Sequence, residues 1–575
     1  MASNTTYDII FAGGGAAACV AAGRLAAADP SLKILILEAG PHTRDLQEHV
    51  QPARFLSNLV PASKVFTFHV GQPSLLLNGR SPIVPSGKCV GGGSSVNFVM
   101  YTRAAASDYD DWENVYDNPG WGSKDMIPLL KKLETYQDTE GNLDVHGKTG
   151  PIKISRGGID LGAGSEFLRA ALAYDKARSF TNDTNDFSSV DSYGSWLMYI
   201  DRESGRRSDA AHHYIYNQES NKNLEVQASC SVVKVLFEGT RAVGVQYINN
   251  GLGLSEPSIA RATKLVVVSA GAFGSPGILQ RSGIGSGTVL MRSGVQQLVD
   301  LPGVGQNYQD HNISFPPYLA SEDSKTLDGI FQKDPEIVDL AAEQWYGHGQ
   351  GLLATNGIEA GGKLRPTVEE LKELGPAFEQ RWNDYFVPAP DKPVVWVGII
   401  MGYVNPTPLP RGNYISAGYY TEYPASTGHL HITSATDPFA PLFFEPGFLK
   451  ESCDLPVLRW GYKKTREIIR RMAQYRGEVA IGHPQYAEDS AAKCCSVDGP
   501  VEIDAPEIKY NKEDDEAIDR YHRDTVATTW HSLGTCAMKP RAQGGVVDSK
   551  LNVYGVENLK VADVCHRNLT NLSSH

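Results

Sequence analysis

A glycine-rich turn near the N-terminus constrains the fold of this chain more than any other feature. Residues 7–12 form an apolar run of strand length, and three glycines at 13–15 end it. Residues 16–28 are small and largely apolar, as in a closely packed helix, and residues 33–37 have the pattern of a second buried strand. A strand, a glycine turn, a helix and a strand in this order are typical of a βαβ unit that binds a dinucleotide.

Each position in this turn has a role in such a unit. Gly13 permits the tight turn, and Gly15 lets backbone N–H groups approach a pyrophosphate at the start of the helix, beside Gly14 and Ala16. Glu38 ends the second strand, where a carboxylate accepts hydrogen bonds from ribose hydroxyls. An acid there favours an unphosphorylated ribose, as in FAD or NAD, over NADP. The alternative is a doubly wound sheet whose glycines serve only packing, which leaves the acid unexplained.

Composition excludes several classes of function. The 575 residues suffice for two or three domains, and their net charge of −13 without a long basic run argues against nucleic acid as a partner. We predict no membrane segment, because no apolar run approaches the roughly 20 residues that cross a bilayer. Eight cysteines in so long a chain predict no disulfide framework, and no cysteine or histidine cluster has the spacing of a metal site.

The same strand patterns return later in the chain. Residues 224–228, 232–237 and 242–248 largely alternate apolar and polar side chains, and residues 265–268 form a buried strand that runs into a small-residue turn. Residues 559–564 have the pattern of one more strand of the same domain. The region from about 321 to 523 is instead rich in aromatic residues, proline and charge, with amphipathic stretches at 367–374 and 455–472. It is predicted to be a second domain inserted into the first.

Three separated motifs resemble those of the glucose-methanol-choline (GMC) flavoprotein oxidoreductases. They are residues 87–104, 271–285 and 528–535. Within the family, the alcohol (methanol) oxidase branch is the most similar, and the residues that carry this resemblance are 101–112, 304–311, 355–361 and 551–555. The resemblance extends over about residues 7–564.

The resemblance implies an α/β chain, α+β overall, with a Rossmann-like FAD-binding domain and an inserted substrate domain of antiparallel sheet plus helices. The expected FAD-binding segments are residues 1–155, 223–320 and 531–575. The expected substrate-domain segments are residues 156–222 and 321–530.

The resemblance also implies which residues hold FAD. Gly13, Gly14, Gly15, Ala16 and Glu38 would lie on the ADP half of the cofactor. The remaining expected contacts lie along the pyrophosphate, the flavin, the adenine and the ribityl chain: Gly91, Gly92, Ser95, Asn97, Val232 and Asp563. Val232 could equally be a plain core valine, and Asn97 a turn residue.

His531 is the expected catalytic residue. Oxidation of a small primary alcohol to an aldehyde sends a hydride to flavin N5, and the hydroxyl proton needs a base such as histidine. We expect a buried setting that keeps His531 neutral, and a structural role for its nearest rival, His311. In an oxidase, O₂ then becomes hydrogen peroxide, as in methanol metabolism. The alternatives are a dehydrogenase that uses a quinone, or a catalytically impaired relative.

The resemblance ends abruptly after Val564. The family continues with a proline, an asparagine-rich turn, a second catalytic residue and a helix, none of which the last residues match. We therefore expect a divergent or truncated C-terminus, either a gene-model artefact or a natural end, and assign no second catalytic residue. The N-terminus lacks the features of a signal peptide, so we expect an intracellular protein, cytoplasmic or peroxisomal. The sequence leaves a homo-oligomer open.

Overall fold

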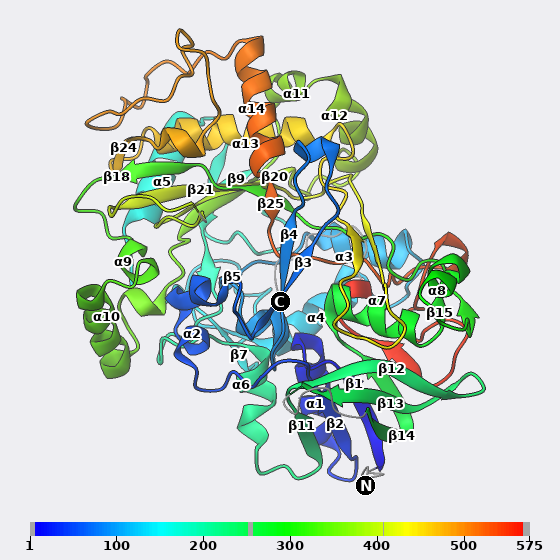
Figure 1. Ribbon diagram of the computed structural model, residues 1–575. Helices are drawn as coiled ribbons and strands as arrows, with labels where there is room; N and C mark the ends of the chain where they lie inside the picture. Colours follow the sequence, from blue (N-terminus) through cyan, green and yellow to red (C-terminus); the bar gives the residue numbers. More distant parts are fainter. Residues whose placement is uncertain (1–5, 251–256, 406, 567–575) are drawn as a thin grey trace.

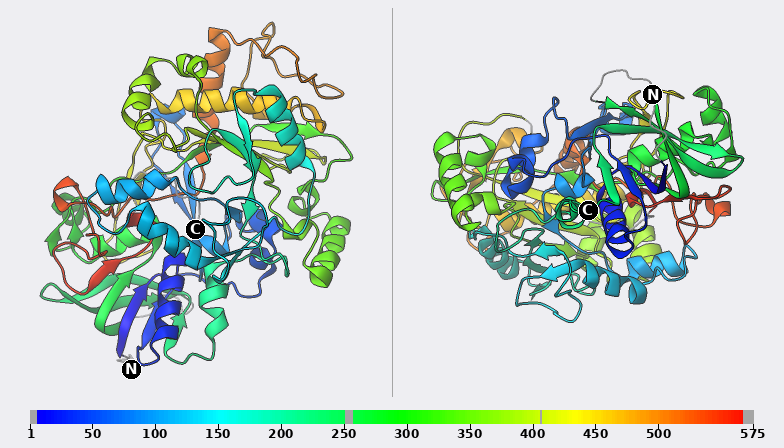
Figure 2. Two further views of the ribbon diagram at one scale, coloured as in Figure 1. Left: turned by 180° about the vertical axis from the view of Figure 1, so that it is seen from behind. Right: turned by 90° about the horizontal axis from the view of Figure 1, so that it is seen from below.

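The structure is a computed structural model, and it describes residues 6–250, 257–405 and 407–566. Two large sheets dominate it, one in the lower half of the view in Figure 1 and one in the upper half. Each sheet is built from distant stretches of the chain. In the view from behind, the red C-terminal segment returns beside the blue and green strands of the lower sheet (Figure 2).

The lower sheet has seven strands in the order β11-β2-β1-β14-β13-β12, with β26 paired to β14. Their bounds are β1 Thr6–Ala12, β2 Ile34–Leu37, β11 Leu224–Gln227, β12 Cys230–Glu238, β13 Arg241–Asn249, β14 Ser258–Val268 and β26 Leu559–Val561. The strand β1 runs parallel to β2 and β14, whereas β12, β13 and β14 pair antiparallel. The strands predicted from the sequence therefore join into one α/β sheet.

The helix α1 (Ala16–Ala28) follows β1 directly and packs beside it. Its buried side is made of small residues, including Ala18, Ala22 and Gly23, because only small side chains let a helix lie this close to its neighbours. A Cβ atom at Gly23 would come within 2.2 Å of the Tyr214 carbonyl oxygen in a short crossing helix. Close packing here holds the middle of α1 against α6 (Ala210–Tyr214).

The upper sheet has nine strands, mostly antiparallel, in the order β24-β18-β21-β20-β19-β9-β8, with β17 and β25 at its side. Their bounds are β8 Ser179–Thr181, β9 Ser192–Ser195, β17 Asn312–Ser314, β18 Pro317–Ala320, β19 Ala360–Leu364, β20 Val395–Ile400, β21 Tyr414–Thr421, β24 Tyr475–Glu478 and β25 Ala527–Thr528. The helix α13 (Asp454–Ile469) packs across β20 and β21 (Figure 1).

The other helices pack against the sheets or against one another. Those of five or more residues are α3 Ala106–Asn114, α4 Ser123–Leu133, α5 Ala163–Tyr174, α6 Ala210–Tyr214, α7 Gly271–Arg281, α8 Gly287–Arg292, α10 Pro335–His348, α11 Val368–Leu374, α12 Pro376–Arg381 and α14 Lys512–Thr525. Within the described ranges, none of these helices combines the length and apolarity that a bilayer crossing demands.

Two sequence expectations differ from this architecture. The range 223–320 was assigned to the first domain, but its last strands, β17 and β18, pair with β21 in the upper sheet. No strand was predicted between residues 39 and 87, yet β3 (Phe66–Val70) and β4 (Ile83–Gly87) form a hairpin there. In both places an apolar run in the sequence can indicate a strand, but it does not specify which other strand it pairs with.

Candidate active site

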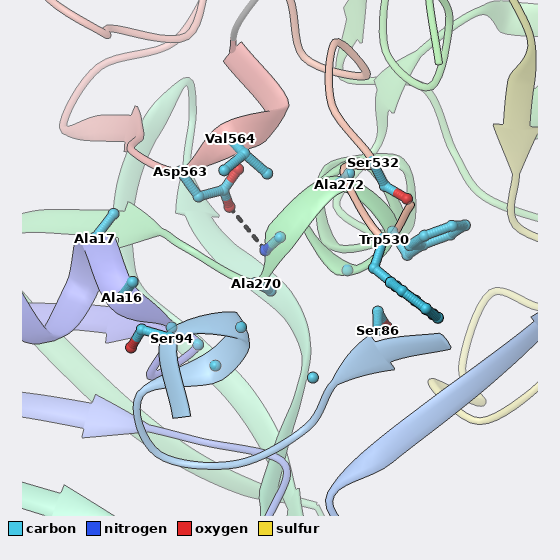
Figure 3. A pocket seen from close by; sticks show the side chains of 18 of the residues that line it. Ala16, Ala17, Ser86, Ser94, Ala270, Ala272, Trp530, Ser532, Asp563 and Val564 are labelled. Carbon is cyan, nitrogen blue, oxygen red and sulfur yellow. Dashed lines mark hydrogen bonds between the residues drawn. The ribbon is translucent and has the colours of Figure 1, made fainter. Parts of the chain in front are cut away.

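A cavity with a volume of about 1650 Å³ is lined by residues of both sheets. Small-molecule pockets usually measure roughly 300–1000 Å³, so this one has room for a dinucleotide together with a substrate. Figure 3 shows Ala16, Ala17 and Ser94 on one side of it and Trp530 and Ser532 on the other.

The glycine turn leaves the start of α1 open toward this cavity. Gly13 has a φ of +109°, and a Cβ atom there would lie 2.4 Å from the Ser269 carbonyl oxygen, so only glycine fits. Gly15 caps the helix without any side-chain hydrogen bond, and a Cβ atom there would meet only that oxygen, at 3.5 Å. The unpaired N–H groups of the first helical turn can therefore hold a pyrophosphate.

Glu38 lies directly beside this turn. One carboxylate oxygen accepts the Gly14 N–H at 2.7 Å and the other accepts the Gly40 N–H at 2.8 Å. Burial raises the pKa of Glu38 to about 7, against the effect of these hydrogen bonds. Glu38 lines the cavity, and each oxygen keeps a second lone pair for a ligand hydroxyl. Gly14 is outside the cavity lining and serves to anchor Glu38.

In the second glycine-rich segment, residues 91–97, some residues line the cavity and others are buried behind it. Gly92 and Asn97 line the cavity, whereas Gly91 and Ser95 do not. The Ser95 hydroxyl is fully buried and donates to Asp209 at 2.6 Å, and a Cβ atom at Gly91 would lie 2.1 Å from that hydroxyl. The structure therefore does not support direct cofactor contacts from Gly91 and Ser95.

Asp563 and Val232 both line the cavity. One Asp563 oxygen accepts the Gly271 N–H at 2.8 Å and the Ser275 hydroxyl at 2.5 Å, so this carboxylate holds the start of α7 (Figure 3). Val232 lies in β12, at the edge of the cavity that Glu38 also borders. Both residues are therefore accessible to a ligand in the cavity.

His531 lines the other end of the cavity, on the loop that follows β25. Asp310 holds this loop: its carboxylate accepts the N–H groups of Thr529 at 3.3 Å and His531 at 3.1 Å. Burial raises the pKa of Asp310 to about 6. Trp530 has a φ of +62°, a costly conformation for a bulky residue, and such strain persists only where the surroundings impose it.

His531 and His311 are direct neighbours. Their Nδ1 atoms lie 2.8 Å apart, and the His311 ring stacks on Tyr420 with a centroid distance of 4.9 Å. Burial lowers the pKa of His311 to about 3, so this ring stays neutral. His531 is only half-buried, which corrects the expectation of a buried setting. His531, and not His311, lines the cavity.

The walls around His531 are apolar and aromatic. Tyr420 lies edge-on to His531 with a centroid distance of 6.0 Å, and Trp396 stacks on Tyr420 at 5.1 Å. Phe98 contacts Trp530 at 4.7 Å between ring centroids. The other apolar residues of this part of the lining are Met100, Ile313, Phe315, Ile358 and Ile400. Such walls suit a small substrate with an apolar carbon chain.

Sequence reasoning missed several residues of this site. Asp310 stands next to His311 in a motif that was recognised, but no role was given to its carboxylate. Trp530 precedes the expected base directly, and its positive φ has no signal in the sequence. Arg207 and Asp209 lie outside every recognised motif. Only the fold brings Asp209 to the cavity wall and Arg207 behind Ser94 and Asn97.

Comparisons with known proteins point to one family. A family model described as GMC oxidoreductase matches residues 7–313, and a second with the same description matches residues 424–566. An alcohol oxidase of Candida boidinii is 42% identical over 620 residues, covering 99% of this chain and 92% of that relative. Alcohol oxidase 1 of Komagataella phaffii is 40% identical with the same coverage. Mitochondrial choline dehydrogenase of Homo sapiens is 30% identical, covering 98% of this chain and 86% of that protein. The alignments cover 92%, 92% and 86% of these three relatives, which does not support the expectation of a truncated chain.

Solved structures show the same fold. An FAD-dependent oxidoreductase from Chaetomium thermophilum superposes with a TM-score of 0.80 at 25% identity, over 99% of this chain and 96% of that one. A formate oxidase structure superposes with a TM-score of 0.81 at 22% identity, over 99% of this chain and 95% of that one.

Proposed function

The chain belongs to the GMC oxidoreductase family, and we propose that it oxidises a small primary alcohol to an aldehyde, with FAD as cofactor and O₂ as electron acceptor. One observation carries the proposal: a single cavity has the glycine-framed start of α1 at one end and His531 at the other. This arrangement supports a dinucleotide cofactor and a base that act in the same space. Hydrogen peroxide is the expected second product.

FAD, when bound, supplies the acceptor for a hydride and later passes electrons to O₂. The residues of this chain have the complementary tasks of binding and proton handling. We assign the ADP half to Gly13, Gly15, Ala16 and Glu38, with Val232 beside the adenine. Gly92, Asn97 and Asp563 are assigned to the rest of the cofactor. The division into an FAD-binding domain and a substrate domain is part of the same proposal.

His531 is proposed to take the hydroxyl proton of the alcohol. It lines the cavity, and its neighbour His311 is kept neutral by burial and so does not compete for that proton. Asp310 fixes the loop on which His531 stands, which keeps the ring in place during the reaction. A positioned histidine of this kind contributes typically about 10²–10⁴-fold in rate.

The substrate class follows from the walls of the cavity and from the relatives. Trp396, Tyr420, Ile313 and Ile400 surround the region near His531 with apolar surface, which disfavours polyhydroxylated substrates such as sugars. The two most similar relatives named above are called alcohol oxidases. Methanol and ethanol are the substrates that we consider first.

The proposal is tested on the purified protein with its flavin. The absorption spectrum reports bound FAD, and anaerobic addition of methanol, ethanol, benzyl alcohol or glucose shows which compound bleaches it. Peroxide formation under air then identifies O₂ as acceptor, with catalase-treated samples as the control. Flavin reduction by short aliphatic alcohols with peroxide formation is expected. Faster reduction by benzyl alcohol or glucose would reject the substrate class, and reoxidation by a quinone but not by O₂ would reject the oxidase.

A further inference from the structure

Arg207 is a buried cation beside the cavity, and within the described residues it makes no ion pair with a carboxylate. The nearby Asp209 carboxylate favours the charged form of Arg207 but is itself paired with His212 at 2.6 Å. Only 3% of the Arg207 surface is exposed. Its Nε donates to the His49 carbonyl at 2.7 Å, and its Nη1 donates to the Ser94 carbonyl at 3.3 Å. Its buried Nη2 has no hydrogen-bond partner. Burial lowers the pKa of Arg207 to about 10, so the group still carries its charge at neutral pH.

Arg207 also fixes the orientation of the Asn97 side chain. Its Nη1 donates to Asn97 Oδ1 at 2.6 Å, and the Val99 N–H donates to the same oxygen at 3.0 Å. A guanidinium and a backbone N–H can only donate. If the Asn97 amide were flipped, its NH₂ group would face these two donors and no hydrogen bond could form. The oxygen of Asn97 must therefore face Arg207. Its NH₂ group is left for the cavity, which Asn97 lines.

The two residues together make one side of the cavity favourable for negative charge. A positive charge that is shielded from water acts over a longer range than one at the surface. The N–H groups of Asn97 add donors on the same side. Both effects are built into the protein before any ligand binds, so no reorganisation opposes them.

We propose that Arg207 is a positioning residue that directs the Asn97 amide into the cavity and favours negative charge on the flavin ring bound there. This inference rests on the proposed function, and it takes Asn97 to lie on the flavin side of the cofactor, as the family resemblance implies. Reduction adds negative charge to the ring, so Arg207 and Asn97 should make reduction more favourable. The expected signature is a raised midpoint potential of the bound FAD.

Three variants separate charge from geometry. Arg207→Met removes both, and Arg207→Lys keeps a charge but cannot bridge Asn97 and two carbonyl groups at once. Asn97→Asp keeps an oxygen for Arg207 and Val99 but replaces the cavity-facing NH₂ with a second oxygen. Arg281 provides a matched control, because it is also buried, donates to the Val233 carbonyl at 2.9 Å and has a pKa lowered to about 10. It lines the cavity without any hydrogen bond to Asn97.

The measurements are the midpoint potential of the bound FAD, by equilibration with a reference dye, and the dissociation constant of FAD from the apoprotein. Arg207→Met and Asn97→Asp should lower the equilibrium constant for flavin reduction at least tenfold, which corresponds to about 30 mV for a two-electron couple. Arg207→Lys should recover part of the loss, and Arg281→Met should shift the potential less than Arg207→Met.

The outcomes distinguish this inference from the proposed function. If the parent protein takes up no FAD, or alcohol does not reduce it, the proposed function fails first. If the parent is active but Asn97→Asp retains the parent potential, the inference is wrong and the function stands. The isosteric Asn97→Asp variant decides the question even if Arg207→Met does not fold. Equal shifts in Arg207→Met and Arg281→Met would also overturn it, because any buried cation would then suffice.

Discussion

The rings of His311 and His531 meet edge to face, with their Nδ1 atoms 2.8 Å apart. This distance requires one proton between the two nitrogens. His311 is neutral because burial lowers its pKa to about 3, and it also makes a hydrogen bond to the backbone of Glu422. A neutral ring has a single N–H, and a ring can bond a carbonyl oxygen only by donating it. We therefore assign the shared proton to His531 Nδ1, which leaves Nε2 as the basic nitrogen of His531.

This assignment predicts different results for two substitutions of His311. In His311→Asn the amide oxygen can still accept from His531 Nδ1, so flavin reduction by alcohol should stay within about tenfold of the parent. In His311→Leu no acceptor remains, so flavin reduction should be slower than in His311→Asn. The loss relative to the parent can reach about 10²–10⁴-fold, the range typical of a lost base. Anaerobic stopped-flow reduction at several pH values measures both. Equal rates in the two variants would contradict the assignment.

His531 itself should matter for flavin reduction and little for flavin binding. His531→Ala is expected to keep its flavin, because the residues assigned to the ADP half lie at the other end of the cavity. Reduction by alcohol should be about 10²–10⁴-fold slower, the usual loss for one acid–base group. Stopped-flow mixing without O₂ isolates this step from reoxidation. A variant that reduces its flavin at the parent rate would place the base elsewhere.

Gly15→Val should abolish FAD binding while leaving the fold in place. A Cβ atom at Gly15 comes no closer than 3.5 Å to other protein atoms, so the added side chain would occupy ligand space and not protein space. Gly347→Val is the matched control, since a Cβ atom there meets nothing within 4 Å and Gly347 lies outside the cavity lining. The flavin-to-protein absorbance ratio and the circular dichroism spectrum test this. Full flavin content in Gly15→Val would refute the assignment of the turn.

The sequence was sufficient to predict the glycine turn, its helix and most strands of the lower sheet, because each has a local pattern. The helix α1 has the predicted bounds, and β1 and β2 differ from prediction by one residue each. The pairing of β17 and β18 with β21 could not be predicted, since residues about 100 positions apart decide it. The same limit explains why Ser95 was expected in the cavity: only the fold brings Asp209 to its hydroxyl.

A buried charged cluster outside the cavity should make stability depend on pH. His146 lies between Glu134 and Asp183, with Nδ1 at 3.1 Å and Nε2 at 2.9 Å from a carboxylate oxygen of each. Its ring stacks on Tyr136 at 3.8 Å, and Arg103 pairs with the same Glu134 oxygen at 2.6 Å. Burial alone would lower the pKa of His146, but the hydrogen bonds to Asp183 and Glu134 raise it above 6.5.

His146→Gln should therefore destabilise the protein more at low pH than at high pH. The folded state holds the His146 proton more tightly than the unfolded chain does, so its contribution to stability is complete below the unfolded pKa of 6.5 and is lost as pH rises through the raised folded value. Breaking a buried ion pair typically costs about 3–5 kcal/mol, which is the loss expected at pH 6, with a smaller loss at pH 9. Urea unfolding midpoints of flavin-loaded protein at both pH values measure this loss.

His522 is the control. Burial lowers its pKa to about 3, so its ring is neutral, and it shares a hydrogen bond of 2.9 Å with the Tyr419 hydroxyl. Above pH 7 both its folded and its unfolded forms are neutral, so the loss in His522→Gln should not change between pH 7 and 9. A loss in His146→Gln that is the same at pH 6 and pH 9 would show that the His146 proton does not contribute to folding.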